Sequence, residues 1–176
     1  ILPYIVLPER QPSDRLDNLT VQGLTYLYPN SSNGIQNFDL ELSAGSFTVI
    51  TGQIGAGKTT LLKALLGVLP IQSGQVCWNS ETVSELKDFF VPPRCAYTPQ
   101  VPRLFSDSLK DNILMGLSDD AELIDHAVRL GVMEEDLPTL ADGLETIVGP
   151  RGVKLSGGQM QRTAAARMFE TGRAHV

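Results

Sequence analysis

The chain has 176 residues, of which 42% are hydrophobic and 19% are charged, as in a soluble globular domain with a core of its own. Fourteen Lys and Arg residues stand against 20 Asp and Glu residues, so the formal net charge is -6. Because a polyphosphate backbone attracts the opposite charge balance, this composition argues against a nucleic-acid partner.

Neither the cysteines nor the apolar runs indicate an extracellular or membrane-spanning chain. Cys77 and Cys95 lie apart in apolar stretches, which favours reduced core thiols over a disulfide or a zinc site. The longest apolar runs, at the N-terminus and at 64–71, are far shorter than the roughly 18 to 20 residues that cross a bilayer. The first run, ILPYIVL, contains Pro3 and is followed by Pro8, and it lacks the features of a signal peptide. We therefore expect a reducing, cytosolic setting.

The predicted elements begin after residues 1–17, a segment rich in proline and charge that we interpret as a linker or arm. Alternating and β-branched patterns predict an antiparallel pair of strands at 19–28 and 35–42, and further strands at 46–51, 74–79 and 94–99. Apolar spacing predicts helices at 58–69, 119–132 and 155–169. The sequence has no internal repeat and no heptad register, so we predict a compact α/β fold.

A glycine-rich loop lies between the predicted strand at 46–51 and the helix at 58–69. The segment GQIGAGKT at 52–59 matches the phosphate-loop pattern G-x-x-x-x-G-K-[ST] in the strand–loop–helix context that this pattern needs. Gly55 and Gly57 can adopt backbone angles closed to other residues, so that successive amides surround phosphate oxygens. The predicted phosphate-binding residues are Gly52, Gln53, Ile54, Gly55, Ala56, Gly57, Lys58, Thr59 and Thr60.

The residues at the end of this loop have distinct predicted roles. Lys58 supplies an ammonium group for the β and γ phosphates, Thr59 offers a hydroxyl to Mg²⁺, and Thr60 adds a phosphate contact. Because kinases, GTPases and ATPases all use such a loop, the pattern predicts the ligand class and leaves the biological role open.

A second pair of glycines opens the helix predicted at 155–169. In KLSGGQMQR at 154–162, Ser156 and Gln159 have the spacing of a capping box. A capping box does not require two glycines between its members, whereas close approach of the backbone to a ligand does. We therefore interpret this segment as a second anion-binding helix N-terminus, with a simple well-capped helix as the alternative.

With both motifs, the sequence resembles the ABC ATPase family over about residues 18–169. The LSGGQ signature of that family matches Leu155, Ser156, Gly157, Gly158 and Gln159. The resemblance implies an α/β fold, namely a P-loop NTPase (RecA-like) core with an antiparallel β subdomain and an α-helical signature subdomain. It also implies ATP and Mg²⁺ as ligands. The partners it implies are a transmembrane domain and a second nucleotide-binding domain, identical or different, whose signature helix faces the phosphate loop.

The resemblance assigns roles to further residues. Gln100 corresponds to the Q-loop residue that contacts Mg²⁺ and senses the membrane domain. Tyr28 corresponds to the aromatic residue that stacks on adenine, although a shift in strand register would put Tyr26 there instead. The segments at 99–113 and 146–152 resemble the exporter branch, with Pro150 where exporters usually carry Glu, and importer ancestry is the alternative.

In the ABC family an aliphatic strand ending in Asp and Glu follows the signature helix, the Asp orienting Mg²⁺ and the Glu polarising the attacking water. After Leu155 the only acidic residue is Glu170, and no aliphatic strand precedes it. We interpret 170–176 as a tail outside the family. We therefore expect the chain to stop before these catalytic residues, to bind nucleotide without turnover, and to leave a sheet edge unprotected.

The function implied by the resemblance is that of an ATP-driven motor domain of an exporter on the cytoplasmic side of the cell membrane. One alternative is a non-catalytic fragment or degenerate subunit that pairs with a complete partner. Another is a DNA-repair or SMC-type ABC ATPase, although those proteins insert long coiled coils that this sequence lacks. We assign no catalytic role to Trp78, predicted to be packed, to His126, predicted to be solvated, or to His175.

Overall fold

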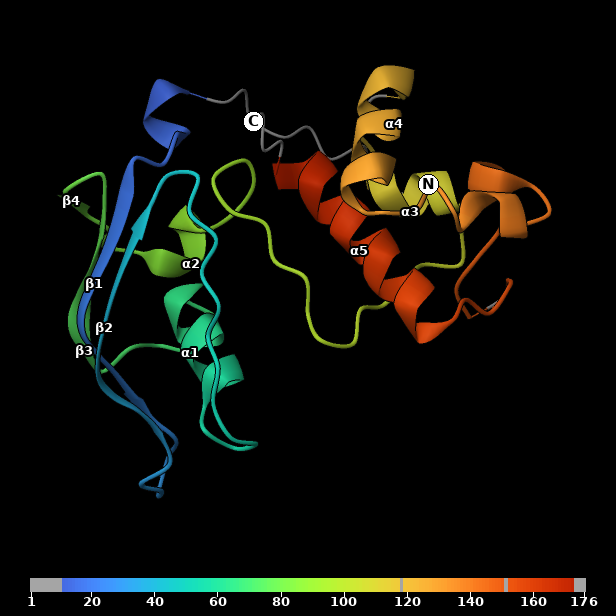
Figure 1. The fold of residues 1–176 in the computed structure, drawn as a ribbon. Coiled ribbons are helices and arrows are strands. Elements are labelled where there is room, and N and C mark those ends of the chain that lie inside the picture. The colour runs from blue at the N-terminus through green and yellow to red at the C-terminus, as the bar shows by residue number, and fades with distance from the viewer. Residues whose placement is uncertain (1–10, 118, 151, 173–176) are drawn as a thin grey trace. The chain divides into compact units, whose positions relative to one another are not determined.

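The computed structural model describes residues 11–117, 119–150 and 152–172 (Figure 1). Most of the predicted arm, and His175 in the predicted tail, lie outside these ranges. The chain divides into two compact units at the boundary between Arg94 and Cys95. We call residues 11–94 the sheet unit and residues 95–172 the helical unit, and describe each by itself.

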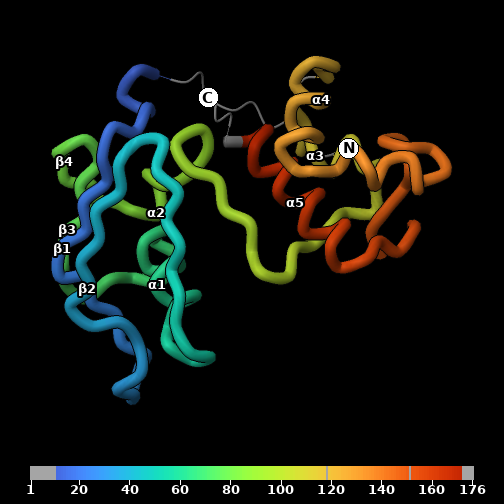
Figure 2. The backbone as a smooth tube through the Cα atoms, viewed as in Figure 1, coloured from blue at the N-terminus to red at the C-terminus, as the bar shows by residue number. Residues whose placement is uncertain are grey.

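The sheet unit is built on antiparallel strands in the order β2-β1-β3-β4 (Figure 2). β1 and β2 pair antiparallel, as do β1 with β3 and β3 with β4. The strands are β1 (Asn18–Leu27), β2 (Gly34–Ser43), β3 (Ser73–Trp78) and β4 (Glu81–Thr82). The strands predicted at 19–28, 35–42 and 74–79 are therefore confirmed. The alternation of apolar residues predicted them because alternate residues of a strand share one face, and here that face is buried.

Two helices of the sheet unit, α1 (Lys58–Leu65) and α2 (Leu86–Phe89), lie on the same side of the sheet (Figure 1). Leu61 and Ala64 of α1 are buried in one cluster with Val21 and Val76 of the strands. Burying such side chains is the main favourable term in folding. This packing fixes the start of α1, and with it the loop at 52–57, on the sheet.

The residues before β1 also pack onto the sheet unit. In the short helix η1 (Pro12–Asp14), Ser13 O accepts a hydrogen bond from the Trp78 indole Nε1 at 3.1 Å. Asp14, 3% exposed, pairs with the Arg94 guanidinium at 2.6 Å. Trp78 contacts Phe89 and Phe90 edge to face, so its predicted packing role is confirmed.

The helical unit packs α5 (Gly157–Gly172) against α3 (Leu109–Leu114) and α4 (Ala121–Leu130). Two short helices, η2 (Leu137–Thr139) and η3 (Gly143–Glu145), join α4 to the segment before α5. Leu109, Ile113 and Met133 are almost fully buried in its core. The helix predicted at 119–132 is confirmed as α4, whose Asp120 side chain caps the amides of the first turn.

A buried polar contact joins α5 to α3. Asn112 is fully buried, and its side chain bonds the backbone of Phe105 in both directions, at 2.8 and 3.0 Å. The Arg167 guanidinium donates to Asn112 O at 2.7 Å, to Asn112 Oδ1 at 3.1 Å and to Arg103 O at 3.2 Å. Burial lowers the pKa of Arg167 from its usual value. We call this contact the Asn112–Arg167 clasp.

Two predicted strands are wrong. Residues 46–51 and 94–99 have no strand conformation and pair with no other described segment. An apolar run becomes a strand only when a neighbouring strand satisfies its amides and carbonyls, and the run alone does not supply that neighbour. Consistent with this, Phe47 is 93% exposed, Val49 64% and Tyr97 42%.

The helix that follows the glycine-rich loop is shorter than predicted. The helix predicted at 58–69 ends at Leu65, because Gly67 takes the left-handed φ of 68° that closes a helix.

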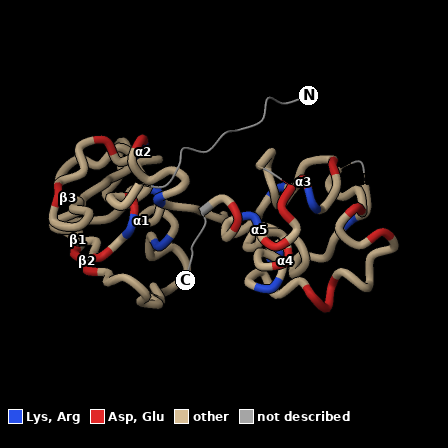
Figure 3. The backbone as a smooth tube through the Cα atoms, turned by 90° about the horizontal axis from the view of Figure 1, so that it is seen from above, with Lys and Arg blue, Asp and Glu red and all other residues tan. Residues whose placement is uncertain are grey.

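Cys77 and Cys95 are free, half-buried thiols, and His126 is exposed. Acidic residues occur in both units, interspersed with Lys and Arg (Figure 3). Across the described ranges, every helix is too short or too polar to traverse a bilayer.

Candidate nucleotide-binding site

The predicted phosphate loop is an exposed loop that leads directly into α1. Gly55 and Gly57 have left-handed φ values of 84° and 88°, which glycine adopts at little cost. A Cβ atom at Gly57 would lie 2.9 Å from Ile35 Cδ1, so a larger residue would also have to displace the end of the Ile35 side chain on β2. The backbone therefore turns where the pattern requires glycine, and its amides stand at the positive end of α1.

Lys58 folds back over this loop. Its Nζ donates to Gly52 O at 2.8 Å and to Gln53 O at 2.9 Å. Both acceptors are neutral carbonyls, and Lys58 forms no ion pair with any residue that the structure describes. The ammonium charge is thus held at the loop without an anion to neutralise it, which suits the residue to binding phosphate.

The two candidate adenine-stacking tyrosines differ in exposure. Tyr26 is 7% exposed and belongs to the core of the sheet unit, whereas Tyr28 is 40% exposed. The Tyr28 hydroxyl bonds Thr60 Oγ1 at 3.1 Å, and the Tyr26 ring meets the Tyr28 ring edge to face at 5.1 Å. The structure therefore brings Tyr28 to the start of α1 with part of its ring accessible, which supports Tyr28 over Tyr26.

The contact between Tyr28 and Thr60 distinguishes the two threonines at the start of α1. Thr60 is 8% exposed and engaged with Tyr28, while Thr59 is exposed. In the described residues no group of three His, Cys, Asp or Glu side chains could hold a metal ion. A Mg²⁺ ion bound through one protein hydroxyl and nucleotide phosphates fits this donor set, because Mg²⁺ commonly takes few protein ligands and several from phosphates and water.

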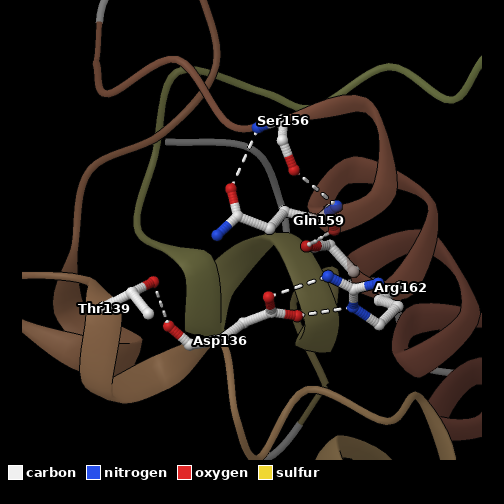
Figure 4. Close-up of polar contacts among 6 residues, drawn as sticks. Asp136, Thr139, Ser156, Gln159 and Arg162 are labelled. Atoms are coloured by element: carbon white, nitrogen blue, oxygen red, sulfur yellow. Dashed lines mark hydrogen bonds and ion pairs between the residues drawn. The ribbon is translucent and has the colours of Figure 1, made fainter.

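The capping box predicted at the start of α5 is confirmed (Figure 4). Ser156 N donates to Gln159 Oε1 at 2.9 Å, and Gln159 N donates to Ser156 Oγ at 3.2 Å. Leu155 is 5% exposed and anchors this turn in the core. Apart from its chain neighbours and the backbone of its own helix, no atom of the described residues lies within 4 Å of the point where a Cβ of Gly157 would be, so a ligand has room to approach the backbone there.

An ion pair beside the capping box was missed by the sequence reading. Arg162 donates from Nε to Asp136 Oδ2 at 2.5 Å and from a second nitrogen to Asp136 Oδ1 at 2.8 Å (Figure 4). The hydrogen bond from Arg162 lowers the pKa of Asp136 below its usual value. The pair ties the loop before η2 to the second turn of α5, and no local pattern links residues so far apart in sequence.

Gln100 lies in the helical unit and is exposed. Its carbonyl accepts a weak hydrogen bond from Gln161 Nε2 of α5 at 3.4 Å. The structure thus brings together Tyr28, Thr60 and the phosphate loop in the sheet unit. Within the helical unit it brings Gln100 to the signature helix.

An exposed glycine loop with a Lys at the start of a helix, accompanied by a second glycine-led helix N-terminus, defines the class of P-loop nucleotide-binding domains. Residues 35–174 match the family model described as ABC transporter. Because this match covers well over half of the sequence, the chain belongs to the ABC transporter family.

Individual relatives and a solved structure agree with that assignment. The chain is 34% identical to the alpha-factor-transporting ATPase of Saccharomyces cerevisiae, over 86% of this chain and 13% of that protein. It is 38% identical to the multidrug resistance-like ATP-binding protein MdlA of Buchnera aphidicola, over 81% of this chain and 25% of that protein. The chain therefore spans a quarter or less of the length of these two relatives.

A structure of a bacterial Atm1-family ABC exporter with ATP bound aligns with a TM-score of 0.78 at 25% identity, covering 95% of this chain and 29% of that one. The predicted fold class is confirmed: the chain has the P-loop fold of an exporter-type ABC ATP-binding domain.

Proposed function

We propose that this chain binds Mg-ATP at the phosphate loop and forms part of the motor that drives export by an ABC transporter. The observation that carries the proposal is the Lys58 ammonium, held over the loop by Gly52 O and Gln53 O. Loop amides and Lys58 bind the β and γ phosphates, and the Thr59 hydroxyl and Gln100 contact Mg²⁺. The Tyr28 ring stacks on adenine, with its hydroxyl placed by Thr60.

The proposed partners are a second nucleotide-binding domain and a transmembrane domain. Several relatives carry names that join export, ATP binding and a permease in one protein. In this proposal the second domain presents its signature helix to the nucleotide held here, and the Gly157 backbone of this chain approaches the nucleotide held by the second domain. The assembly would place the chain on the cytoplasmic side of the cell membrane.

We also propose that a polypeptide of these 176 residues binds Mg-ATP without sustained hydrolysis. Hydrolysis needs a group that polarises the attacking water. Glu170, the only acidic residue after Leu155, is 3% exposed and thus shielded from a water molecule at a solvent-facing loop. A lone ATP-binding half-site is the outcome we expect.

The experiment that tests binding is a calorimetric titration of Mg-ATP into the purified chain. Lys58→Ala should weaken binding by about tenfold to a hundredfold, the effect of losing one or two charge-assisted hydrogen bonds. Lys87→Ala removes the same charge from an exposed position on α2 and should leave the affinity unchanged. Absence of binding in the wild-type chain would contradict the proposal.

Phosphate release by the same preparation tests the second proposal. We expect no release above the level of the Lys58→Ala chain. Sustained release that Lys58→Ala abolishes would show that hydrolysis occurs and that the proposal of binding without turnover is wrong.

A further inference from the structure

The turn between β1 and β2 ends in the bond between Asn33 and Gly34, the only Asn-Gly pair in the sequence. Because glycine has no side chain to shield its amide nitrogen, this nitrogen can reach the side-chain carbonyl carbon of a preceding asparagine. Asparagine is one of the residue types that are chemically labile in proteins. Whether this pair reacts depends on how the fold holds its two groups.

The Asn33 side chain is available for such a contact. It is exposed, and its amide forms no hydrogen bond with any residue that the structure describes. The bonds of Asn33 come from its backbone, since its N donates to Ser31 Oγ at 3.0 Å and its O accepts from Tyr28 N at 3.0 Å. The side chains of Asn79 and Asn112, by contrast, are each fixed by several hydrogen bonds.

The Gly34 amide faces away from β1. Gly34 lies opposite Leu27 in the ladder of β1 and β2, but Leu27 N donates to Gln72 Oε1 at 3.1 Å and Leu27 O accepts from Gln72 Nε2 at 3.2 Å. Since the N–H and C=O of a strand residue point the same way, Leu27 and Gly34 form a non-hydrogen-bonded pair. β2 is an edge strand of this sheet, so the ladder leaves the Gly34 N–H unused.

The same bond connects the two halves of the proposed nucleotide site. Asn33 O holds the backbone of Tyr28, and Gly34 O lies 3.4 Å from the point where a Cβ of Gly57 would be. A Cβ at Gly34 itself would lie 2.0 Å from Tyr26 O. The main chain therefore cannot lengthen at this bond unless the end of β1 or the phosphate loop moves.

We propose that Asn33 is a site of spontaneous covalent modification, at which the side-chain amide becomes a carboxylate that weakens nucleotide binding. Gly34 N attacks the Asn33 Cγ atom and forms a cyclic imide. The bond from Cγ to the side-chain nitrogen breaks, and ammonia leaves with the proton that Gly34 N gives up. Water then opens the ring at either carbonyl, which yields Asp or isoAsp. No electrons are transferred, and water is the co-reactant.

The consequence for ATP rests on the proposed function. Both products add a negative charge to the turn that carries Tyr28, and this charge repels the nucleotide phosphates. IsoAsp also inserts a further carbon atom into the main chain, at a bond that Tyr26 O and the phosphate loop confine. We therefore expect the Asp product to weaken Mg-ATP binding by about threefold and the isoAsp product by at least about tenfold.

The test ages the full chain at mildly alkaline pH, where Gly34 N loses its proton more readily, and follows Asn33 by peptide mapping with mass spectrometry. Labelling with an isoaspartyl methyltransferase distinguishes isoAsp from Asp. Asn33 should convert within days, whereas Asn30, exposed in the same turn but followed by Ser31, should remain an amide. An unchanged Asn33 under conditions that convert a free peptide of residues 28–38 would overturn the proposal, because the fold would then protect the bond.

Asn33→Gln is the matched control. Gln keeps a neutral amide, but its longer side chain must close a larger ring and reacts more slowly. The φ of Asn33 is not left-handed, so Gln fits the turn. The converted wild-type chain is separated by ion exchange and titrated with Mg-ATP. Its affinity should fall as stated, while aged Asn33→Gln keeps the affinity of the fresh variant. Equal affinities of the converted and fresh wild-type chains would show that the modification does not reach the nucleotide site.

Hydrogen exchange at the Tyr28 amide separates this inference from the proposed function. Because Tyr28 N donates to Asn33 O, the isoAsp chain should exchange this hydrogen faster than the fresh chain, whether or not the chain binds ATP. Conversion of Asn33 with faster exchange at Tyr28, in a chain that does not bind Mg-ATP when fresh, would overturn the nucleotide proposal alone. Mg-ATP binding by the fresh chain, with Asn33 unchanged after aging, would overturn the modification proposal alone.

Discussion

The N-termini of α1 and α5 expose their backbone amides in different ways. α1 begins after Gly57, which has a φ of 88° and provides no side-chain cap. α5 begins after Ser156, whose side chain and Gln159 satisfy two amides reciprocally. Unpaired amides at a helix start are stabilised by a ligand, whereas capped amides are already satisfied. We infer that α1 supplies most of the phosphate affinity, and that α5 acts on a nucleotide already held elsewhere.

The units also differ in what holds them together. The sheet unit depends on antiparallel ladders and one apolar cluster, which its two helices cover. The helical unit adds the buried Asn112–Arg167 clasp to its apolar core. We therefore expect steric changes to be most damaging in the sheet unit, and loss of a buried hydrogen-bonding group to be most damaging in the helical unit.

The largest expected effect is on the sheet unit, at the end of α1. Gly67 and Gly45 have nearly equal φ values of 68° and 69°, but a Cβ at Gly67 would lie 2.2 Å from Lys87 N, whereas at Gly45 it would meet nothing within 4 Å. Gly67→Ala should therefore lower the free energy of unfolding by about 3 kcal/mol or more, through strain and overpacking. Gly45→Ala should cost about 1 kcal/mol from strain alone.

Urea denaturation of both glycine variants measures this difference. Equal losses in the free energy of unfolding would show that the backbone where α1 meets α2 can move aside without an energetic cost. The sheet unit would then be less tightly packed than its apolar cluster indicates.

The next effect is on the helical unit. Asn112→Ala removes the side chain that bonds the backbone of Phe105 and Ser108 and accepts from Arg167. Because several buried groups lose their partner, we expect a loss of about 2–3 kcal/mol in the free energy of unfolding. Hydrogen exchange should show lost protection of 105–114 and unchanged protection of β1. Equal loss in both units would show that they unfold as one.

Much of the fold could be predicted from local sequence. The pattern of 19–28 and 35–42 gave the right strands because one face of each is apolar, and Ser156 and Gln159 gave the right cap because the whole box lies within four residues. The strands predicted at 46–51 and 94–99 are wrong. Apolar composition indicates that a segment tends to be buried, but it does not identify the strand with which the segment would pair. Phe47 is an example, because it lies in an apolar run and is nevertheless 93% exposed.

The candidate site shows the same limit. The phosphate loop is a contiguous pattern, so its glycines, Lys58 and Thr59 could be located from sequence alone. The choice between Tyr26 and Tyr28 depends on strand register. The pairing of β1 with β2 and β3 buries Tyr26 and leaves Tyr28 40% exposed, and the stacking role of Tyr28 stays a prediction. The Asp136–Arg162 pair and the Asn112–Arg167 clasp join residues far apart in the chain, and no periodicity predicts such contacts.

A smaller effect concerns ligand affinity at the start of α1. Tyr28→Ala should weaken Mg-ATP binding by about tenfold, since stacking of a base on an aromatic ring contributes roughly 1–3 kcal/mol. Tyr28→Phe keeps the ring and loses only the bond to Thr60, so its affinity should stay within about threefold of wild type. Calorimetry of both variants, with Tyr26→Leu as the control that removes the other ring, checks the assignment. Loss of affinity in Tyr26→Leu but not in Tyr28→Ala would reverse it.

The smallest effect is the pH dependence of the ion pair beside the capping box. Arg162 lowers the pKa of Asp136 in the folded chain. A carboxyl group with a lowered folded pKa stabilises the fold at pH values above its unfolded pKa of about 4, and this contribution is lost as the pH falls through the folded pKa. Asp136→Asn should therefore lower the thermal unfolding midpoint by a few degrees at neutral pH, and the gap to wild type should close below about pH 4.

The matched control for this ion pair is Asp125→Asn on α4. Asp125 pairs with Arg129, but both side chains are more than half exposed, and exposed pairs contribute little to stability. We therefore expect no pH-dependent gap for Asp125→Asn. If the gap for Asp136→Asn persists unchanged into acid, the carboxylate charge is not what stabilises this turn. The contribution would then come from the hydrogen bonds to Arg162, because Asn has the shape of Asp but replaces one of the two acceptor oxygens with a donor.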